Sequence, residues 1–146
     1  MTDKLALLHS PRPEPPDGGL AFDLPWPPST NTYWRHTLIK GKPRVLLSQE
    51  GRVFRRAAAH ALLLQGIVIK GLDGRLAVQI ILHAPDRTKR DLDNFGGKAV
   101  LDAITHANVW HDDSQVDDLH IRRGHIVKGG LCHVRIRTLN HDEIVK

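Results

Sequence analysis

The stretch Leu76-Ala-Val-Gln-Ile-Ile-Leu-His83 is apolar along almost its whole length. A run of this length and composition is typical of a strand at the centre of a sheet. A charged loop follows it, and residues 91–107 then carry the pattern of a helix. The stretch therefore predicts a central strand that leads through a loop into a helix.

Further strands are predicted on both sides of this unit. Proline cannot donate to a strand ladder, so the segment before Pro25 is expected to end as a first strand. In Cys132-His-Val-Arg-Ile-Arg-Thr138 the apolar residues alternate with basic ones, as in a strand with one buried face. The expected extended segments are 20–24, 31–36 and 44–47 around the turn Gly41-Lys-Pro43, 116–123 and 131–139.

A first helix is expected from an N-cap at Ser48 to about Leu64, where Gly66 ends it. Val53, Ala57, Leu62 and Leu63 are expected to line its inner face. The order β-β-β-α-β-α-β-β predicts an α+β fold: a single domain with a mixed β-sheet and two main helices packed on one face.

The chain divides by composition into a domain and two flanking segments. Residues 1–19 are rich in proline and glycine and are expected to form a flexible arm. Residues 140–146 are expected to form a polar tail, which leaves residues 20–139 as the domain. The 146 residues fit one domain.

Composition restricts the class of protein and of partner. The formal net charge of +5 and the pI of about 9.7 favour a polyanionic partner. The single cysteine, Cys132, excludes an internal disulfide framework. No apolar run is long enough to span a bilayer, and the apolar patch Leu5–Leu8 is too short for a signal peptide. A cytoplasmic protein that does not bind membranes is expected.

The main candidate site lies in Asp86-Arg-Thr-Lys-Arg-Asp-Leu-Asp-Asn94. Asp91 and Asp93 point the same way from an extended segment, and two like charges side by side are stabilised by a cation between them. Hard divalent cations such as Mg²⁺ take carboxylate oxygens. Nearby cations could hold phosphates, as in a metal-dependent phosphodiesterase. The alternative is a solvated charged loop, since aspartate is favourable at a helix N-terminus in any case.

A second acidic motif, Trp110-His-Asp-Asp-Ser-Gln-Val116, follows the second predicted helix. That helix would be about 24 Å long, so Asp112 and Asp113 approach the first motif only if the chain returns along the sheet. An ordinary acidic turn is the alternative. Lys98 is expected on the first turn of the helix, where it could stabilise charge on a phosphate. The alternative role of Lys98 is a surface ion pair with Asp102, four residues later on the same helix.

Other metal and nucleotide sites are not favoured. The histidines lack zinc-ligand spacing, no second cysteine exists, and Gly96-Gly97 lacks the spacing of a phosphate-binding loop. Cys132 lies in a predicted strand and is expected to be packed rather than catalytic.

In combination and in order, the motifs resemble the RusA family of Holliday junction resolvases. The matching segments are Pro25-Trp-Pro-Pro-Ser-Thr-Asn31, Arg90-Asp-Leu-Asp-Asn94, Lys98, Leu101-Asp-Ala103 and Trp110-His-Asp-Asp-Ser-Gln-Val116. The resemblance covers residues 20–139. It implies a homodimer that binds four-way DNA junctions and uses Mg²⁺ to cut two strands symmetrically near the crossover.

The resemblance also assigns roles to residues. Asp91, Asp93 and Asp113 match the family's catalytic, metal-binding aspartates, and Asp112, their acidic neighbour, is expected as a further metal ligand. Lys98 matches the family's catalytic lysine, but three residues separate it from Asn94 where the family has two. One extra residue rotates a helical side chain by about 100°. Gly96-Gly97 could absorb the difference by delaying the helix start; otherwise Lys89 or Arg90 could supply the charge.

The sequence therefore predicts a Mg²⁺-dependent endonuclease that resolves four-way junctions in recombination and repair. Two alternatives stay open: a non-catalytic module that binds DNA junctions, and a Mg²⁺-dependent nuclease for other branched or duplex DNA. The residues expected to contact DNA are basic and lie around the acidic motifs or in the last two strands: Arg87, Lys89, Arg90, Arg122, Arg123 and Lys128.

Overall fold

The computed structural model describes residues 19–67 and 71–145 and contains a four-stranded sheet in the order β1-β6-β4-β5. β4 pairs in parallel with β5, while β6 pairs antiparallel with both β4 and β1, so the expected mixed sheet is confirmed. The connection from β4 to β5 is a helical crossover, as a parallel pair requires. The strands are β1 (Leu20–Leu24), β4 (Leu76–His83), β5 (Val116–Arg123) and β6 (Leu131–Thr138).

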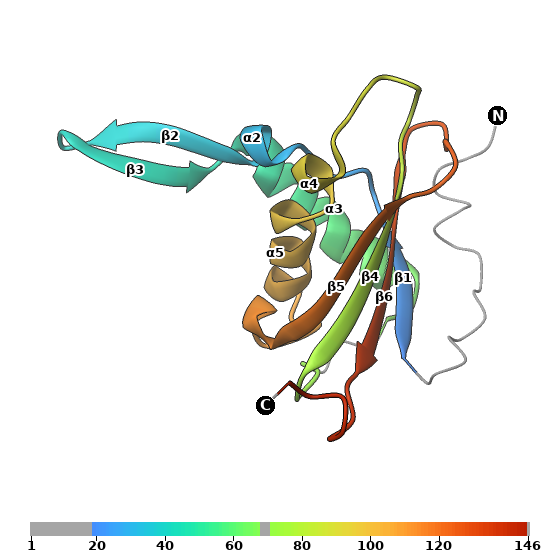
Figure 1. Cartoon of the computed structure of the whole chain (residues 1–146). Coiled ribbons are helices and arrows are strands. Elements are labelled where there is room, and N and C mark those ends of the chain that lie inside the picture. The colour runs from blue at the N-terminus through green and yellow to red at the C-terminus, as the bar shows by residue number, and fades with distance from the viewer. Residues whose placement is uncertain (1–18, 68–70, 146) are drawn as a thin grey trace.

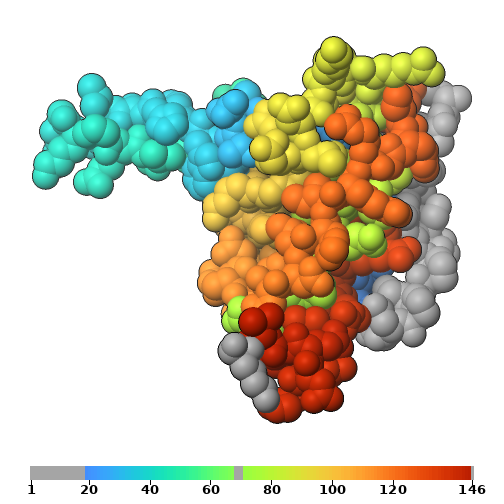
Figure 2. All heavy atoms as spheres, in the orientation of Figure 1, coloured from blue at the N-terminus to red at the C-terminus, as the bar shows by residue number. Residues whose placement is uncertain are grey.

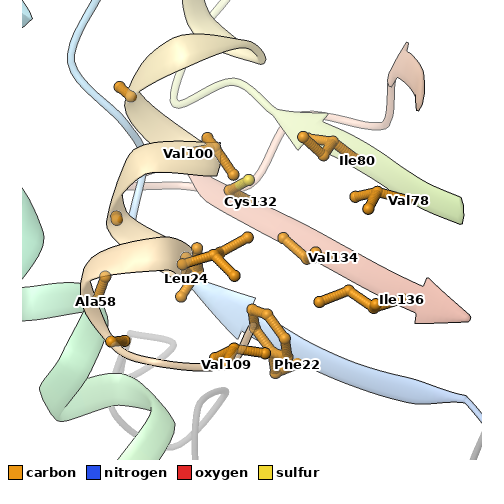
Figure 3. Packing of buried hydrophobic residues seen from close by; sticks show 14 of the residues in the cluster. Phe22, Leu24, Ala58, Val78, Ile80, Val100, Val109, Cys132, Val134 and Ile136 are labelled. Atoms are coloured by element: carbon orange, nitrogen blue, oxygen red, sulfur yellow. The ribbon is translucent and has the colours of Figure 1, made fainter. Parts of the chain in front are cut away.

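The helices α3 (Gln49–Leu64) and α5 (Lys98–His106) cover one face of this sheet (Figure 1). The core lies between the two layers, where Phe22, Ile80 and Val134 of the sheet and Val100 of α5 belong to one buried cluster (Figure 3). Cys132 is fully buried there, as expected. The predicted α+β fold with two main helices on one face is therefore confirmed.

Helix α3 begins as expected, because the Ser48 side chain accepts a hydrogen bond from Gly51 N at 3.0 Å. Its predicted inner face is right at Leu62, which is buried, but wrong at two other positions. Val53 and Leu63 are 49% and 69% exposed, and Phe54 is buried in their place. Several apolar stripes run along this alanine-rich helix, and packing selects the one that places its only aromatic ring in the core. The residues on the buried face are Gly51, Phe54, Ala58, Ala61 and Leu62.

The second predicted helix is interrupted. It consists of α4 (Leu92–Phe95) and α5, with Gly96 and Gly97 between them. Gly96 is buried against β5, and a Cβ atom there would lie 2.4 Å from Cγ2 of Ile121. A residue without a side chain is therefore needed for this close approach, and the glycine pair delays the start of α5 until Lys98.

Residues 34–47 form a separate two-stranded hairpin instead of joining the main sheet. β2 (Trp34–Ile39) and β3 (Lys42–Leu47) extend away from the body of the molecule (Figure 1). Lys40 and Gly41 have φ values of 51° and 73°, as a two-residue hairpin turn requires. The extended segment expected at 31–36 is wrong in its first half, because a short helix α2 (Thr30–Tyr33), capped by Ser29, precedes β2.

The C-terminal residues 140–145 form a turn, in which Glu143 pairs with Arg137 at 2.7 Å. The expected N-terminal arm falls outside the described residues except for Gly19. None of the helices in the described ranges is both long and apolar enough to cross a membrane.

Candidate active site

Asp91 and Asp93 stand at the beginning of α4. Asp91 occupies the N-cap position, where its carbonyl oxygen accepts from Asn94 N at 3.2 Å, and Asp93 lies in the first turn. Both residues are exposed. Within residues 19–67 and 71–145, neither carboxylate has a hydrogen bond or an ion pair. The two side chains are therefore uncommitted acceptors beside the helix N-terminus.

The second acidic motif contacts the start of α5. Its aspartate Asp113 begins the 3₁₀ helix η1 (Asp113–Gln115), and Lys98 Nζ lies 3.2 Å from Asp113 Oδ2. Lys98 is the first residue of α5, which agrees with the delayed helix start. The alternative pair of Lys98 with Asp102 is not formed, because Asp102 binds Tyr33 and Arg55 instead.

Asp112 differs from Asp113 because its side chain caps η1. Its Oδ2 atom accepts hydrogen bonds from the backbone N–H and the hydroxyl of Ser114, and these bonds lower the pKa of Asp112 below its usual range. Gln115 completes the cap, since its Oε1 accepts from Asp112 N at 2.9 Å. One Asp112 oxygen is thus used to hold the turn that presents Asp113 beside Lys98.

The donor chemistry of the acidic residues suits Mg²⁺, which prefers hard carboxylate oxygens and retains several waters. Asp91 and Asp93 fit this requirement as exposed carboxylates without protein partners. The described ranges contain no group of three histidine, cysteine or acidic side chains close enough to hold an ion. The structure therefore joins Lys98 with Asp113 and leaves the four-carboxylate metal set of Asp91, Asp93, Asp112 and Asp113 as a prediction.

The predicted DNA contacts divide into two groups. Arg90 pairs with Asp86 at 2.8 Å and lies over the Trp26 ring, 5.7 Å from its centroid. Its guanidinium lowers the pKa of Asp86 well below the usual range. Arg123 donates to Arg90 O at 2.8 Å. Arg90 and Arg123 therefore brace the loop before Asp91.

The remaining basic residues are exposed. Arg87 and Lys89 lie in the loop between β4 and α4, next to the acidic pair. Arg122 points to the opposite side from Ile121 by strand alternation, and Ile121 faces the helix layer at Gly96. Lys128 lies in the loop between β5 and β6. Of these four, Arg87 and Lys89 are the neighbours of Asp91 in sequence.

A partly buried polar cluster beside the site was not expected from the sequence. Tyr33 is fully buried, and its hydroxyl donates to Asp102 Oδ2, to which Arg55 Nε and Nη2 also donate at 2.8 and 2.6 Å. Burial and the carboxylate of Asp102 raise the pKa of Tyr33 above its usual range. The cluster joins α2, α3 and α5. The sequence feature that could have indicated this cluster was Asp102, an acidic residue between the apolar residues Leu101 and Ala103 on a predicted helix.

Thr30 adds a direct link to the acidic motif. Its hydroxyl donates to Asn94 O at 3.1 Å, so the residues before the hairpin contact the helix that carries Asp93. The apolar Trp26 ring also packs on Phe95, with ring centroids 5.3 Å apart. Both contacts place the Pro25–Asn31 segment against α4, which gives this segment a structural role.

Comparison with known proteins places the chain in a family. The family model described as endodeoxyribonuclease RusA matches residues 25–137. The crossover junction endodeoxyribonuclease RusA of Escherichia coli K12 is 37% identical over 122 residues, which cover 84% of this chain and 97% of the relative. The enzyme of the same name from Enterobacteria phage 82 is 38% identical over 120 residues, which cover 82% of this chain and 94% of the relative. The chain therefore belongs to the endodeoxyribonuclease RusA family of nucleases.

Proposed function

We propose that the chain is a Mg²⁺-dependent endonuclease that resolves four-way DNA junctions by symmetric phosphodiester hydrolysis, in recombination and repair. The observation that carries the proposal is the contact between Lys98 and Asp113, at 3.2 Å, which links the second acidic motif to the first residue of α5. The names of the RusA relatives support the same substrate, since both describe a crossover junction endodeoxyribonuclease.

Asp91, Asp93 and Asp113 would hold the metal, with Asp112 keeping the η1 turn in place. Bound Mg²⁺ supplies an activated water and stabilises the leaving oxygen. Lys98 lies beside Asp113 and would stabilise the negative charge that develops on the phosphate. Arg87 and Lys89 are exposed next to Asp91, where they can hold the neighbouring phosphates of the strand.

Symmetric cleavage requires two sites. A homodimer with two-fold symmetry provides one site for each of the two equivalent strands of a junction. The net charge of +5 favours association with a polyanion such as DNA. The proposal includes action in the cytoplasm, where a single free cysteine stays reduced.

The test is a cleavage assay with an end-labelled four-way junction and a linear duplex of the same arm sequence, each with Mg²⁺ or with EDTA. We expect paired nicks in the junction with Mg²⁺, none with EDTA and little cutting of the duplex. Binding without cleavage would support the non-catalytic module. Equal cutting of duplex and junction would support a nuclease for other DNA.

A further inference from the structure

The hairpin of residues 34–47, called the arm below, stands clear of the rest of the protein (Figure 2). Each strand has six residues, which corresponds to a length of about 20 Å at about 3.3 Å per residue. An isolated two-stranded hairpin is only marginally stable in water. The arm is therefore expected to gain stability from a partner that covers it.

The side chains of the arm suit a polyanionic partner with apolar surfaces. Cross-strand partners share a face, so Leu38 lies beside Pro43 and His36 beside Val45 on one side. Leu38 and Val45 are 70% and 56% exposed on this mostly apolar face. The opposite face carries basic side chains around Ile39. Residues 34–47 contain no acidic side chain. The basic side chains are Arg35, Lys42 and Arg44, with Lys40 in the turn.

We propose that the arm is a DNA-contacting element that enters the branch point of the junction, an inference that rests on the proposed function. A two-stranded ribbon fits the major groove of DNA. Apolar side chains of DNA-binding proteins insert between base steps where the duplex is distorted. Lys42 and Arg44 bind phosphates, while Leu38 at the tip contacts base faces that the crossover leaves unstacked.

The base of the arm is joined to the candidate active site. Ser48 N, at the end of the arm, donates to Tyr33 O at 2.9 Å, so the two strands are tied together where they leave the body. Tyr33 then binds Asp102 of α5, the helix that begins at Lys98. Thr30 donates to Asn94 O beside Asp93. DNA bound by the arm is thereby held in a fixed relation to the aspartates.

Leu38→Ser tests the apolar contact, and Leu63→Ser is its matched control. Leu63 is 69% exposed, almost the same as Leu38, but it lies near the C-terminal end of α3, and the arm joins the N-terminal end. A fluorescent four-way junction and a linear duplex, both without divalent metal, are titrated with each full-length variant. We expect Leu38→Ser to weaken junction binding at least about fivefold with little effect on duplex, and Leu63→Ser to change neither.

The double variant Lys42→Ala/Arg44→Ala tests the phosphate contacts through the salt dependence of junction binding. The slope of log K against log salt is expected to fall by about 1.8, at about 0.9 for each lost phosphate contact. Both variants change exposed residues, so we expect both to fold, and circular dichroism is the check.

Three results would overturn the inference. Leu38→Ser could bind the junction as tightly as Leu63→Ser, the double variant could keep the wild-type salt slope, or Leu38→Ser could convert a wild-type dimer to a monomer in light scattering. The last result would assign the arm to a second copy of the chain. A wild-type protein that binds junctions through the arm but never cuts them would instead refute the proposed function alone.

Discussion

Replacing Asp102 by alanine removes the acceptor shared by Arg55 and Tyr33. Tyr33 is fully buried, so its hydroxyl proton loses its acceptor where no water replaces it, although Arg55 Nε still donates to the hydroxyl oxygen at 3.2 Å. The lost bond costs about 1–3 kcal/mol. The Arg55 side chain is 25% exposed and can rehydrate, so loss of its ion pair adds only about 1 kcal/mol. The expected decrease in the free energy of unfolding is about 2–4 kcal/mol.

Urea denaturation measures this change. The midpoint is expected to fall while the slope m stays the same, because the variant alters stability and not the surface exposed on unfolding. Adding Tyr33→Phe to Asp102→Ala is expected to restore about 1 kcal/mol, since it removes the stranded hydroxyl. The recovery would identify the buried hydroxyl as the main source of the loss.

Glu143→Ala is the control, because it also breaks an ion pair with an arginine. Glu143 and Arg137 are each about one third exposed, so the expected loss is at most about 1 kcal/mol. If Asp102→Ala destabilised the protein no more than Glu143→Ala, the cluster would not hold α2, α3 and α5 together, and the reasoning would be wrong.

Three further predictions concern single residues. Gly96→Ala should destabilise the protein by about 1–3 kcal/mol in urea, since its methyl group would overlap Ile121; wild-type stability would contradict this packing. Lys98→Met should change stability by at most about 1 kcal/mol but slow junction cleavage at least about 100-fold, and unchanged cleavage would exclude its catalytic role. Cys132 should react with a thiol reagent only as fast as the protein unfolds, because burial raises the pKa of its thiol; rapid labelling of the native protein would disagree.

Local sequence patterns predicted the strands well because each is bounded by turn residues. Leu20–Leu24 ends at a proline, and Leu76–His83 is apolar along almost its whole length, so both were predicted with the observed limits. The inner face of α3 was not predictable in the same way. Small alanines fit several rotations of that helix, and only contact with the sheet selects the one that buries Phe54.

The candidate site was predictable in its residue types but not in its contacts. The acidic motifs and Lys98 were identified from the sequence and the family resemblance, and the glycine pair suggested a delayed helix start. The contact between Lys98 and Asp113 depends on how the chain returns after α5, which no local pattern contains. The detached arm was missed for a related reason: its turn predicts pairing of its strands with each other and says nothing about the main sheet.

The most direct test of the central claim compares Asp93→Asn with the wild type in binding and cleavage of one labelled four-way junction. The substitution keeps the size of an exposed side chain that has no hydrogen bond or ion pair with the described residues, so the fold and DNA binding should be unchanged. We expect wild-type junction affinity together with loss of Mg²⁺-dependent cleavage. An Asp93→Asn protein that nicks the junction at the wild-type rate would contradict the assignment of Asp91 and Asp93 to the active site.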